Sequence, residues 1–140
     1  MLFLGSVWRD YVMMEKILRD EIKKIREKFL ICGPYMLTLG DEMRQRILLI
    51  LAEAGTDGMD VADITAKTHL SRPAISHHLK ILKDTGMITS HKKGTQVYYF
   101  IYIQNVLDKL KDLLMSVQDL VSGIDMESIK EKAPWMVNVE

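Results

Sequence analysis

The apolar residues of this chain recur at helical spacing over most of its length. Over residues 12–31 they step by three or four positions, which predicts an amphipathic helix that Gly33 and Pro34 end. A second helix is expected over 41–54. Over residues 105–123 the apolar steps alternate between four and three, which predicts a last helix with a heptad-like seam.

Capping residues mark two short helices in the middle of the chain. Asp60 is a candidate N-cap for a helix through Lys67, and Ser71 is a candidate N-cap for the next one. Pro73 lies in the first turn of that helix, where a backbone N–H has no helical partner, and Gly86 suits its C-terminal end. The back of this helix is expected to be buried and consists of Ile75, Leu79 and Leu82.

The pattern then changes to that of a β-hairpin. Residues 87–91 and 96–103 are rich in β-branched and aromatic side chains, and a basic stretch with a glycine separates them. The chain is therefore expected to be mostly α with a β-hairpin wing, in the order α-α-α-α-β-β-α, which is a winged helix-turn-helix. The 140 residues predict a single domain, with a winged-helix core over 41–103, outer helices over 12–31 and 105–123, and a tail over 125–140.

Charge is distributed unevenly along the chain. The formal net charge is zero, but residues 67–96 carry six Lys or Arg and one acid, so this segment is basic and the remainder is acidic. The longest strongly apolar run, residues 47–52, is too short to span a membrane. The single Cys32 cannot form an internal disulfide, which fits a cytoplasmic protein. We expect Cys32 to be buried and inert, with a redox sensor as the alternative.

Two segments resemble a known family of regulators. Residues 44–51 after Leu39-Gly40-Asp41 are similar to the first core helix of the ArsR/SmtB family, and residues 70–82 with 86–88 are similar to its recognition helix and the start of its wing. The resemblance covers about residues 39–103. It implies a homodimeric repressor that binds double-stranded DNA at a palindromic operator, with a dimer interface formed by the first and last helices.

The polar face of the helix after Ser71 is the candidate DNA-reading surface. Arg72, Ser76 and His77 lie near its N-terminal end, where an arginine can grip guanine and serine or histidine can reach base edges. The alternative is a solvated polar face, and for the hairpin tip a charged turn. His78 is expected to face the core as a structural or phosphate-bonding histidine, with base reading as the alternative. Contacts to phosphates or from the wing are expected from Ser71, Lys80, Lys83, His91, Lys92, Lys93, Thr95 and Gln96.

The apolar stripes of the two outer helices are candidate dimer contacts. The last helix carries a second apolar strip beside its seam, formed by Leu107, Leu114 and Val121. So wide an apolar arc favours one side buried in the chain's own domain and one side offered to a second copy, although both stripes could instead fill the domain's core. The interface candidates are Leu18, Ile22, Ile25, Phe29, Val106, Leu110, Leu113, Val117 and Leu120.

The ligands that the resemblance suggests for a metal are missing from their expected places. Residues 60–67 hold no cysteine, and residues 105–123 hold aspartates but no histidine. We therefore expect no metal; a carboxylate site from Asp108 and Asp112 is the alternative. The sequence also holds no Gly-rich phosphate loop, no His-Glu helix pair for zinc and no serine nucleophile in a strained turn, so we expect no cofactor and no enzyme activity. The effector is either an unidentified small molecule, oxidation of Cys32, or absent. The rival functions are a winged-helix module that binds protein and a non-specific architectural DNA binder.

Overall fold

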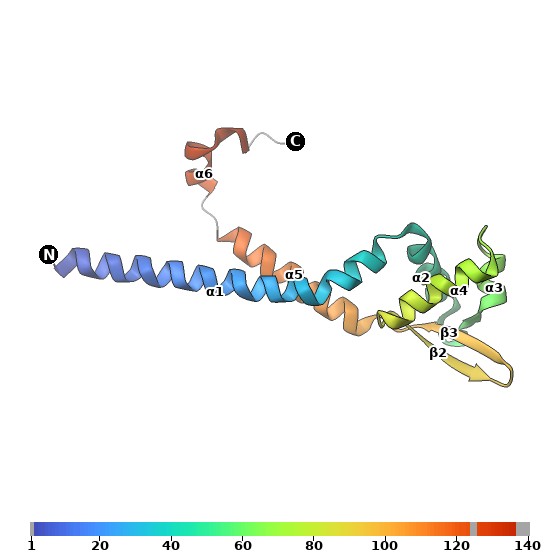
Figure 1. Cartoon of the computed structure of the whole chain (residues 1–140). Helices are drawn as coiled ribbons and strands as arrows, with labels where there is room; N and C mark the ends of the chain where they lie inside the picture. The colour runs from blue at the N-terminus through green and yellow to red at the C-terminus, as the bar shows by residue number, and fades with distance from the viewer. Residues whose placement is uncertain (1, 124–125, 137–140) are drawn as a thin grey trace. The chain divides into compact units, whose positions relative to one another are not determined.

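The computed structural model describes residues 2–123 and 126–136, and its contacts divide the chain into two compact units (Figure 1). One unit is Leu30–Leu110, and the other comprises the segments on either side of it. None of the described helices combines the length and apolarity that a membrane crossing requires.

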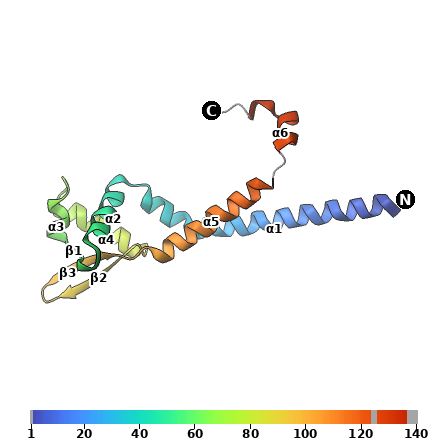
Figure 2. The ribbon, with the colours of Figure 1, turned by 180° about the vertical axis from the view of Figure 1, so that it is seen from behind.

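The central unit is a winged helix-turn-helix, as the sequence predicts (Figures 1 and 2). Its three-stranded antiparallel sheet has the order β1-β3-β2, and the wing is formed by β2 and β3, which pair from Ile88↔Ile101 to Lys93↔Gln96. Strand β1 was not expected, because two residues are too few to show an alternating pattern. The elements are α2 (Glu42–Ala54), η1 (Gly55–Asp57), β1 (Met59–Asp60), α3 (Val61–Ala66), α4 (Arg72–Asp84), β2 (Ile88–Lys93), β3 (Gln96–Ile101) and the first part of α5 (Gln104–Ser122).

The predicted caps of α3 and α4 are confirmed. The Asp60 carboxylate accepts a hydrogen bond from the Asp63 N–H at 2.8 Å, and the Ser71 hydroxyl accepts one from the Ala74 N–H at 3.4 Å. These bonds satisfy backbone donors that have no partner inside the helix. One apolar core lies beneath the helices and the sheet, and it includes Ile47, Leu51, Ile64, Ile75, Leu79, Leu82, Met87 and Val106.

The end of α4 is a Schellman turn that leads directly into the wing. Gly86 has φ +77° and donates its N–H to the Lys83 carbonyl at 3.0 Å, while the Met87 N–H bonds the Leu82 carbonyl at 2.9 Å. The Met87 side chain is fully buried in the core. The prediction that Gly86 ends the helix is confirmed, and the wing begins two residues later, at Ile88.

The prediction for the first helix is wrong at both ends. Helix α1 (Leu2–Leu39) continues through Pro34. The proline lacks an N–H for the Leu30 carbonyl, but one missing bond does not end the helix because its last turn is held from outside. Arg44 of α2 donates to the carbonyls of Leu37 at 3.1 Å and Thr38 at 2.8 Å. Tertiary hydrogen bonds thus override the local signal.

The other unit contains the N-terminal part of α1 and the end of α5. Ile25 and Leu113 are buried in it. Lys28 Nζ donates to Asp112 Oδ1 at 3.1 Å and to Ser116 Oγ at 2.6 Å. The expected tail is described over 126–136, where it forms α6 (Met126–Lys132) and η2 (Pro134–Met136); residues 125 and 137–140 lie outside the described part.

Candidate nucleic-acid interface

Helix α4 separates a buried back from an exposed polar front. Ile75, Leu79 and Leu82 are at most 1% exposed, so the predicted back is confirmed. The three candidate base-reading side chains, Arg72, Ser76 and His77, are all exposed. Within the described residues the structure shows no ion pair for the Arg72 guanidinium. The front of α4 therefore carries free hydrogen-bonding groups near its N-terminus, where the helix dipole also favours an anion.

The lysines of α4 already have partners on the protein. Lys80 Nζ lies 2.7 Å from Asp84 Oδ2, and Lys83 Nζ donates to Ser90 Oγ on β2 at 2.7 Å. The Lys80–Asp84 pair is mostly exposed, so it contributes little and can exchange with solvent. The Asp84 charge nevertheless opposes a phosphate at this end of the helix. The C-terminal half of α4 is thus a poorer phosphate site than the predicted list implies.

The wing presents the remaining predicted cations at its tip. His91, Lys92, Lys93, Thr95 and Gln96 are all exposed, and the two-residue loop has a positive φ only at Gly94, as in a type II′ turn. Lys93 Nζ lies 5.3 Å from the centre of the Tyr98 ring, which keeps the ammonium close to the strand. Lys92 is in the opposite phase of the strand, where alternate side chains point to the other face. The tip therefore offers one cation on each face.

His78 differs from His77 and lies toward α2, as expected. Its Nδ1 is buried 3.9 Å from Asp41 Oδ1, too far for a hydrogen bond. The Asp41 carboxylate caps α2 by accepting from the Arg44 N–H at 2.9 Å. That backbone bond, helped by the Arg44 guanidinium and by His78, holds the pKa of Asp41 below its ordinary value, against the opposing effect of burial. Asp41 is a neighbour of His78 that the sequence did not reveal.

Two further side chains position α3 and α4, and sequence reasoning missed them. Arg46 of α2 donates to the Lys67 carbonyl at 3.0 Å, at the end of α3. Thr38 of α1 is hydrogen-bonded to Thr85, the residue that follows α4. Both contacts join residues distant in sequence, and one of them ends on a backbone carbonyl, so no local pattern signals them.

The outer helices expose many large apolar side chains. Of the predicted interface residues, Ile25, Val106 and Leu113 are already buried within one chain, and Leu110, Val117 and Leu120 are partly buried. Leu18, Ile22 and Phe29 remain between 41% and 49% exposed. The second strip on α5 is also exposed, and so is the first half of α1. These further exposed side chains are Val7, Trp8, Tyr11, Val12, Met13, Met14, Ile17, Leu107, Leu114, Met115 and Val121.

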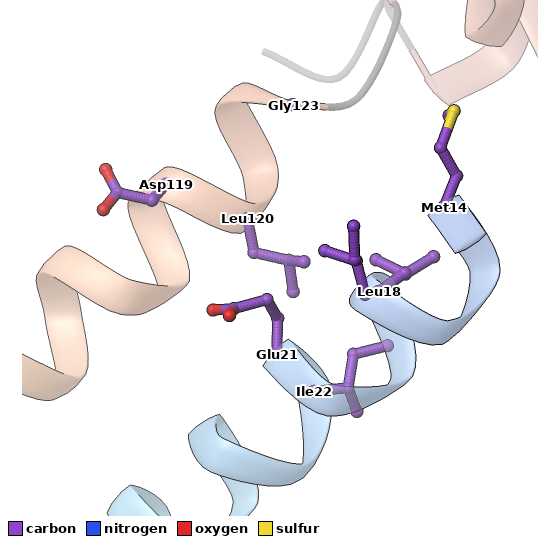
Figure 3. A pocket seen from close by; sticks show the side chains of 8 residues that line it. Met14, Leu18, Glu21, Ile22, Asp119, Leu120 and Gly123 are labelled. Carbon is purple, nitrogen blue, oxygen red and sulfur yellow. The ribbon is translucent and has the colours of Figure 1, made fainter. Parts of the chain in front are cut away.

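A groove of about 670 Å³ lies between α1 and α5 within the same unit (Figure 3). Leu18 and Ile22 face Leu120 across it, and Met14 lines it one turn before Leu18 on α1. The carboxylate of Glu21 stands at the edge of this mostly apolar surface. The groove thus continues the exposed apolar face of the two helices.

No group of three or more metal-ligating side chains comes together in the described residues. Cys32 is 1% exposed, and its Sγ is 3.5 Å from the Lys109 carbonyl, which is the buried environment expected for an inert thiol. Asp108 bonds Gln104 Nε2 at 2.9 Å, and Asp112 bonds Lys28. Both carboxylates of the alternative metal site are thus already engaged with protein groups.

Comparisons with known proteins agree with this fold. Residues 41–90 match the model of the bacterial regulatory protein, arsR family. An HTH-type transcriptional regulator of Methanocaldococcus jannaschii is 36% identical over 94 residues, which cover 67% of this chain and 99% of the relative. The transcriptional repressor SdpR of Bacillus subtilis is 37% identical over 76 residues, covering 54% and 81% of the two chains. The transcriptional regulator HlyU of Vibrio vulnificus has a similar structure, with a TM-score of 0.53 and 28% identity over 69% of this chain and 96% of that one.

Proposed function

The chain belongs to the arsR family of bacterial regulatory proteins and is a DNA-binding transcriptional regulator, and we propose that it acts in the cytoplasm as a homodimeric repressor on a palindromic operator. The observation that carries the proposal is the exposure of Arg72, Ser76 and His77 at the N-terminal end of α4, above a fully buried back. A helix with this division can enter the major groove while its core face stays fixed in the domain.

Within this proposal, Arg72, Ser76 and His77 read base edges. Arg72 suits guanine, whose O6 and N7 accept two parallel hydrogen bonds from a guanidinium. The wing lysines and the Ser71 end of α4 hold phosphates, which sets affinity but not sequence. Lys80 and Lys83 contribute less, because Asp84 and Ser90 occupy their ammonium groups.

The exposed apolar side chains of α1 and α5 support the proposed homodimer. A soluble monomer rarely exposes so many contiguous large apolar side chains, and a standard interface buries about 800 Å² on each partner. A second copy covers the half-exposed Leu18, Ile22 and Phe29, the strip with Leu114, and the groove between the helices. Two-fold symmetry then presents two α4 helices to successive turns of one DNA face.

Selection of bound duplexes from a random pool, at fixed and stated salt, tests the DNA-binding proposal. We expect an inverted repeat with half-sites centred about 10–10.5 base pairs apart. Arg72→Ala is expected to cost about 1–3 kcal/mol at one base position and to relax specificity there. Arg72→Lys is the matched control: it keeps the charge but loses the planar fork, so it should relax specificity similarly while losing less affinity for unrelated DNA.

The same experiment separates the rival functions. Binding to every sequence with a Kd of about 10⁻⁴–10⁻⁶ M and no enriched site indicates an architectural binder. Absence of DNA binding indicates a protein-interaction module.

Analytical ultracentrifugation tests the dimer. Leu114→Glu, at a residue that is 66% exposed on α5, should shift the chain toward monomer. Leu49→Glu is the control, because Leu49 is 67% exposed on α2 in the winged-helix unit. Equal dissociation of both variants, or a wild-type monomer, contradicts the proposed interface.

A further inference from the structure

His78 of α4 holds a polar atom that has no partner in the described part of the chain. Its Nδ1 is the one buried side-chain nitrogen or oxygen there that makes no hydrogen bond. The side chain as a whole is 17% exposed, so the accessible part of the ring lies on the side of Nε2. An unsatisfied buried atom costs free energy, so its presence on α4 needs a physical explanation.

The charged groups around this nitrogen come from the start of α2 and from α4 itself, all within the winged-helix unit. Asp41, the N-cap of α2, places Oδ1 3.9 Å from Nδ1. Arg44 approaches the other oxygen of that carboxylate, with Nη1 3.9 Å from Oδ2, while its Nε and Nη2 donate to backbone carbonyls. The ring centre of His77 lies 6.2 Å from that of His78. One carboxylate therefore faces Nδ1 just beyond hydrogen-bond distance.

The doubly protonated imidazole is the form that suits both ring nitrogens at a DNA surface. A neutral ring has a single N–H, so either Nδ1 presents a lone pair to the Asp41 carboxylate or Nε2 has no proton to donate. The imidazolium has an N–H on each nitrogen, one toward Asp41 and one free for an acceptor outside the protein. Histidine is the side chain whose ordinary charge change lies near neutral pH.

The side of α4 that carries His78 also carries the end assigned to phosphates. Ser71 and His78 are seven residues apart, which is two helical turns, so they lie on one side of the helix. The Asp41 side chain is 37% exposed beside them, and its negative charge opposes a phosphate there. A proton on His78 offsets that charge and also supplies a hydrogen-bond donor.

We propose that His78 contacts a DNA phosphate as an imidazolium whose Nδ1–H is accepted by Asp41, so that this regulator takes up a proton from solvent when it binds DNA. The inference rests on the DNA-binding surface proposed above, because it requires α4 to face the duplex. Linkage is reciprocal: a duplex that favours the charged ring is itself bound more tightly at lower pH. The negative potential of the other phosphates acts in the same direction.

Isothermal titration calorimetry of wild type with the selected duplex counts this proton directly. The binding enthalpy is measured at pH 7 in buffers of different ionisation enthalpy and equal ionic strength, and the slope gives the number of protons taken up. We expect about half to one proton for each protomer. The Kd should be about tenfold or more lower at pH 6 than at pH 8, the equivalent of one hydrogen bond to a charged group.

Two variants remove the two halves of the proposed interaction. His78→Gln retains a donor near the position of Nε2 but cannot take up a proton, so its Kd should differ by less than about twofold between pH 6 and pH 8. Asp41→Asn keeps the cap of α2 and removes the charge, so it should reduce the wild-type difference to about threefold. Combining the two should give the pH dependence of His78→Gln alone, because both act on one interaction.

His69→Gln is the matched control for the loss of a titrating ring. His69 is exposed in the turn before α4 and is not among the predicted DNA contacts, so this variant should keep the wild-type pH dependence. Circular dichroism at both pH values confirms that each variant is folded under the binding conditions.

The proposal is overturned if wild type takes up no proton on binding, a result that needs no variant. It is also overturned if His78→Gln weakens binding by the same factor at pH 6 and pH 8, as loss of a merely structural side chain does. Disappearance of the pH dependence in His77→Gln instead assigns the proton to the wrong ring and has the same consequence. Failure of the proposed function is distinct: wild type then prefers no duplex at either pH.

Discussion

Gly58→Ala tests how tightly the turn after η1 packs against the Phe100 ring of β3. Gly58 has φ +66° and ψ −173°, a region that is essentially restricted to glycine, so any Cβ costs about 1–3 kcal/mol there. A Cβ at this position would also lie 2.5 Å from the Phe100 ring on β3. Moving that ring costs about 1–3 kcal/mol more, as for other overpacked sites. Gly58→Ala should therefore lower the free energy of unfolding by about 2–6 kcal/mol.

Gly55 supplies a matched control at the other end of the same turn. It has φ +56° and ψ −132°, and an added Cβ would meet nothing within 4 Å. Urea unfolding followed by circular dichroism, at one protein concentration, compares the two variants through their midpoints at constant slope. Gly55→Ala should lose only the backbone part, and adding Phe100→Leu to Gly58→Ala should recover part of the difference. The reasoning is refuted if the Gly58 variant is no less stable than the Gly55 variant.

Three further predictions follow from the caps and the wing. Ser71→Ala should cost about 1 kcal/mol in urea unfolding through loss of the N-cap of α4, and Ser71→Asp should cost much less. The double variant Lys92→Ala, Lys93→Ala should weaken binding to all sequences alike and reduce the slope of log K against log salt by about 1–2, whereas an unchanged slope removes the wing from the interface. The pKa of Asp41 is lowered from 3.8, so its stabilisation is present above that pH and is lost as the pH falls through the folded-state value. Asp41→Asn keeps the cap but removes the charge, so its unfolding midpoint should lie below that of wild type at pH 7 and the two midpoints should converge in acid; a difference that stays constant down to low pH contradicts this.

The sequence predicts those parts of the fold that are stabilised by contacts between residues a few positions apart. Asp60 and Ser71 bond backbone N–H groups three residues ahead, and Gly86 adopts a conformation that its own lack of a Cβ permits. The end of α1 could not be predicted in this way. Pro34 gives a genuine stop signal, but Arg44 compensates for it from another helix.

The candidate site shows the same limit. The separation of Arg72 from Ile75 and Leu79 follows from helical periodicity alone, so the exposed and buried faces of α4 were predicted. The partner of Lys83 was not, because Ser90 comes near only after the Schellman turn places β2. Periodicity also could not show which residues of the α5 seam the chain buries by itself: Val106 is buried in the core of the winged helix, whereas Val117 is only partly buried.

The turn at Gly86 and Met87 also limits where the length of the chain can vary. Its two hydrogen bonds join the last turn of α4 to the residues just before Ile88, so no slack separates the recognition helix from β2. One inserted residue there would shift the register of β2 and turn every wing side chain to the opposite face of the sheet. Residues added at Gly94 leave the pairing at the root intact. Insertions or deletions at the tip would therefore change the length of the wing, while the connection between α4 and β2 stays the same.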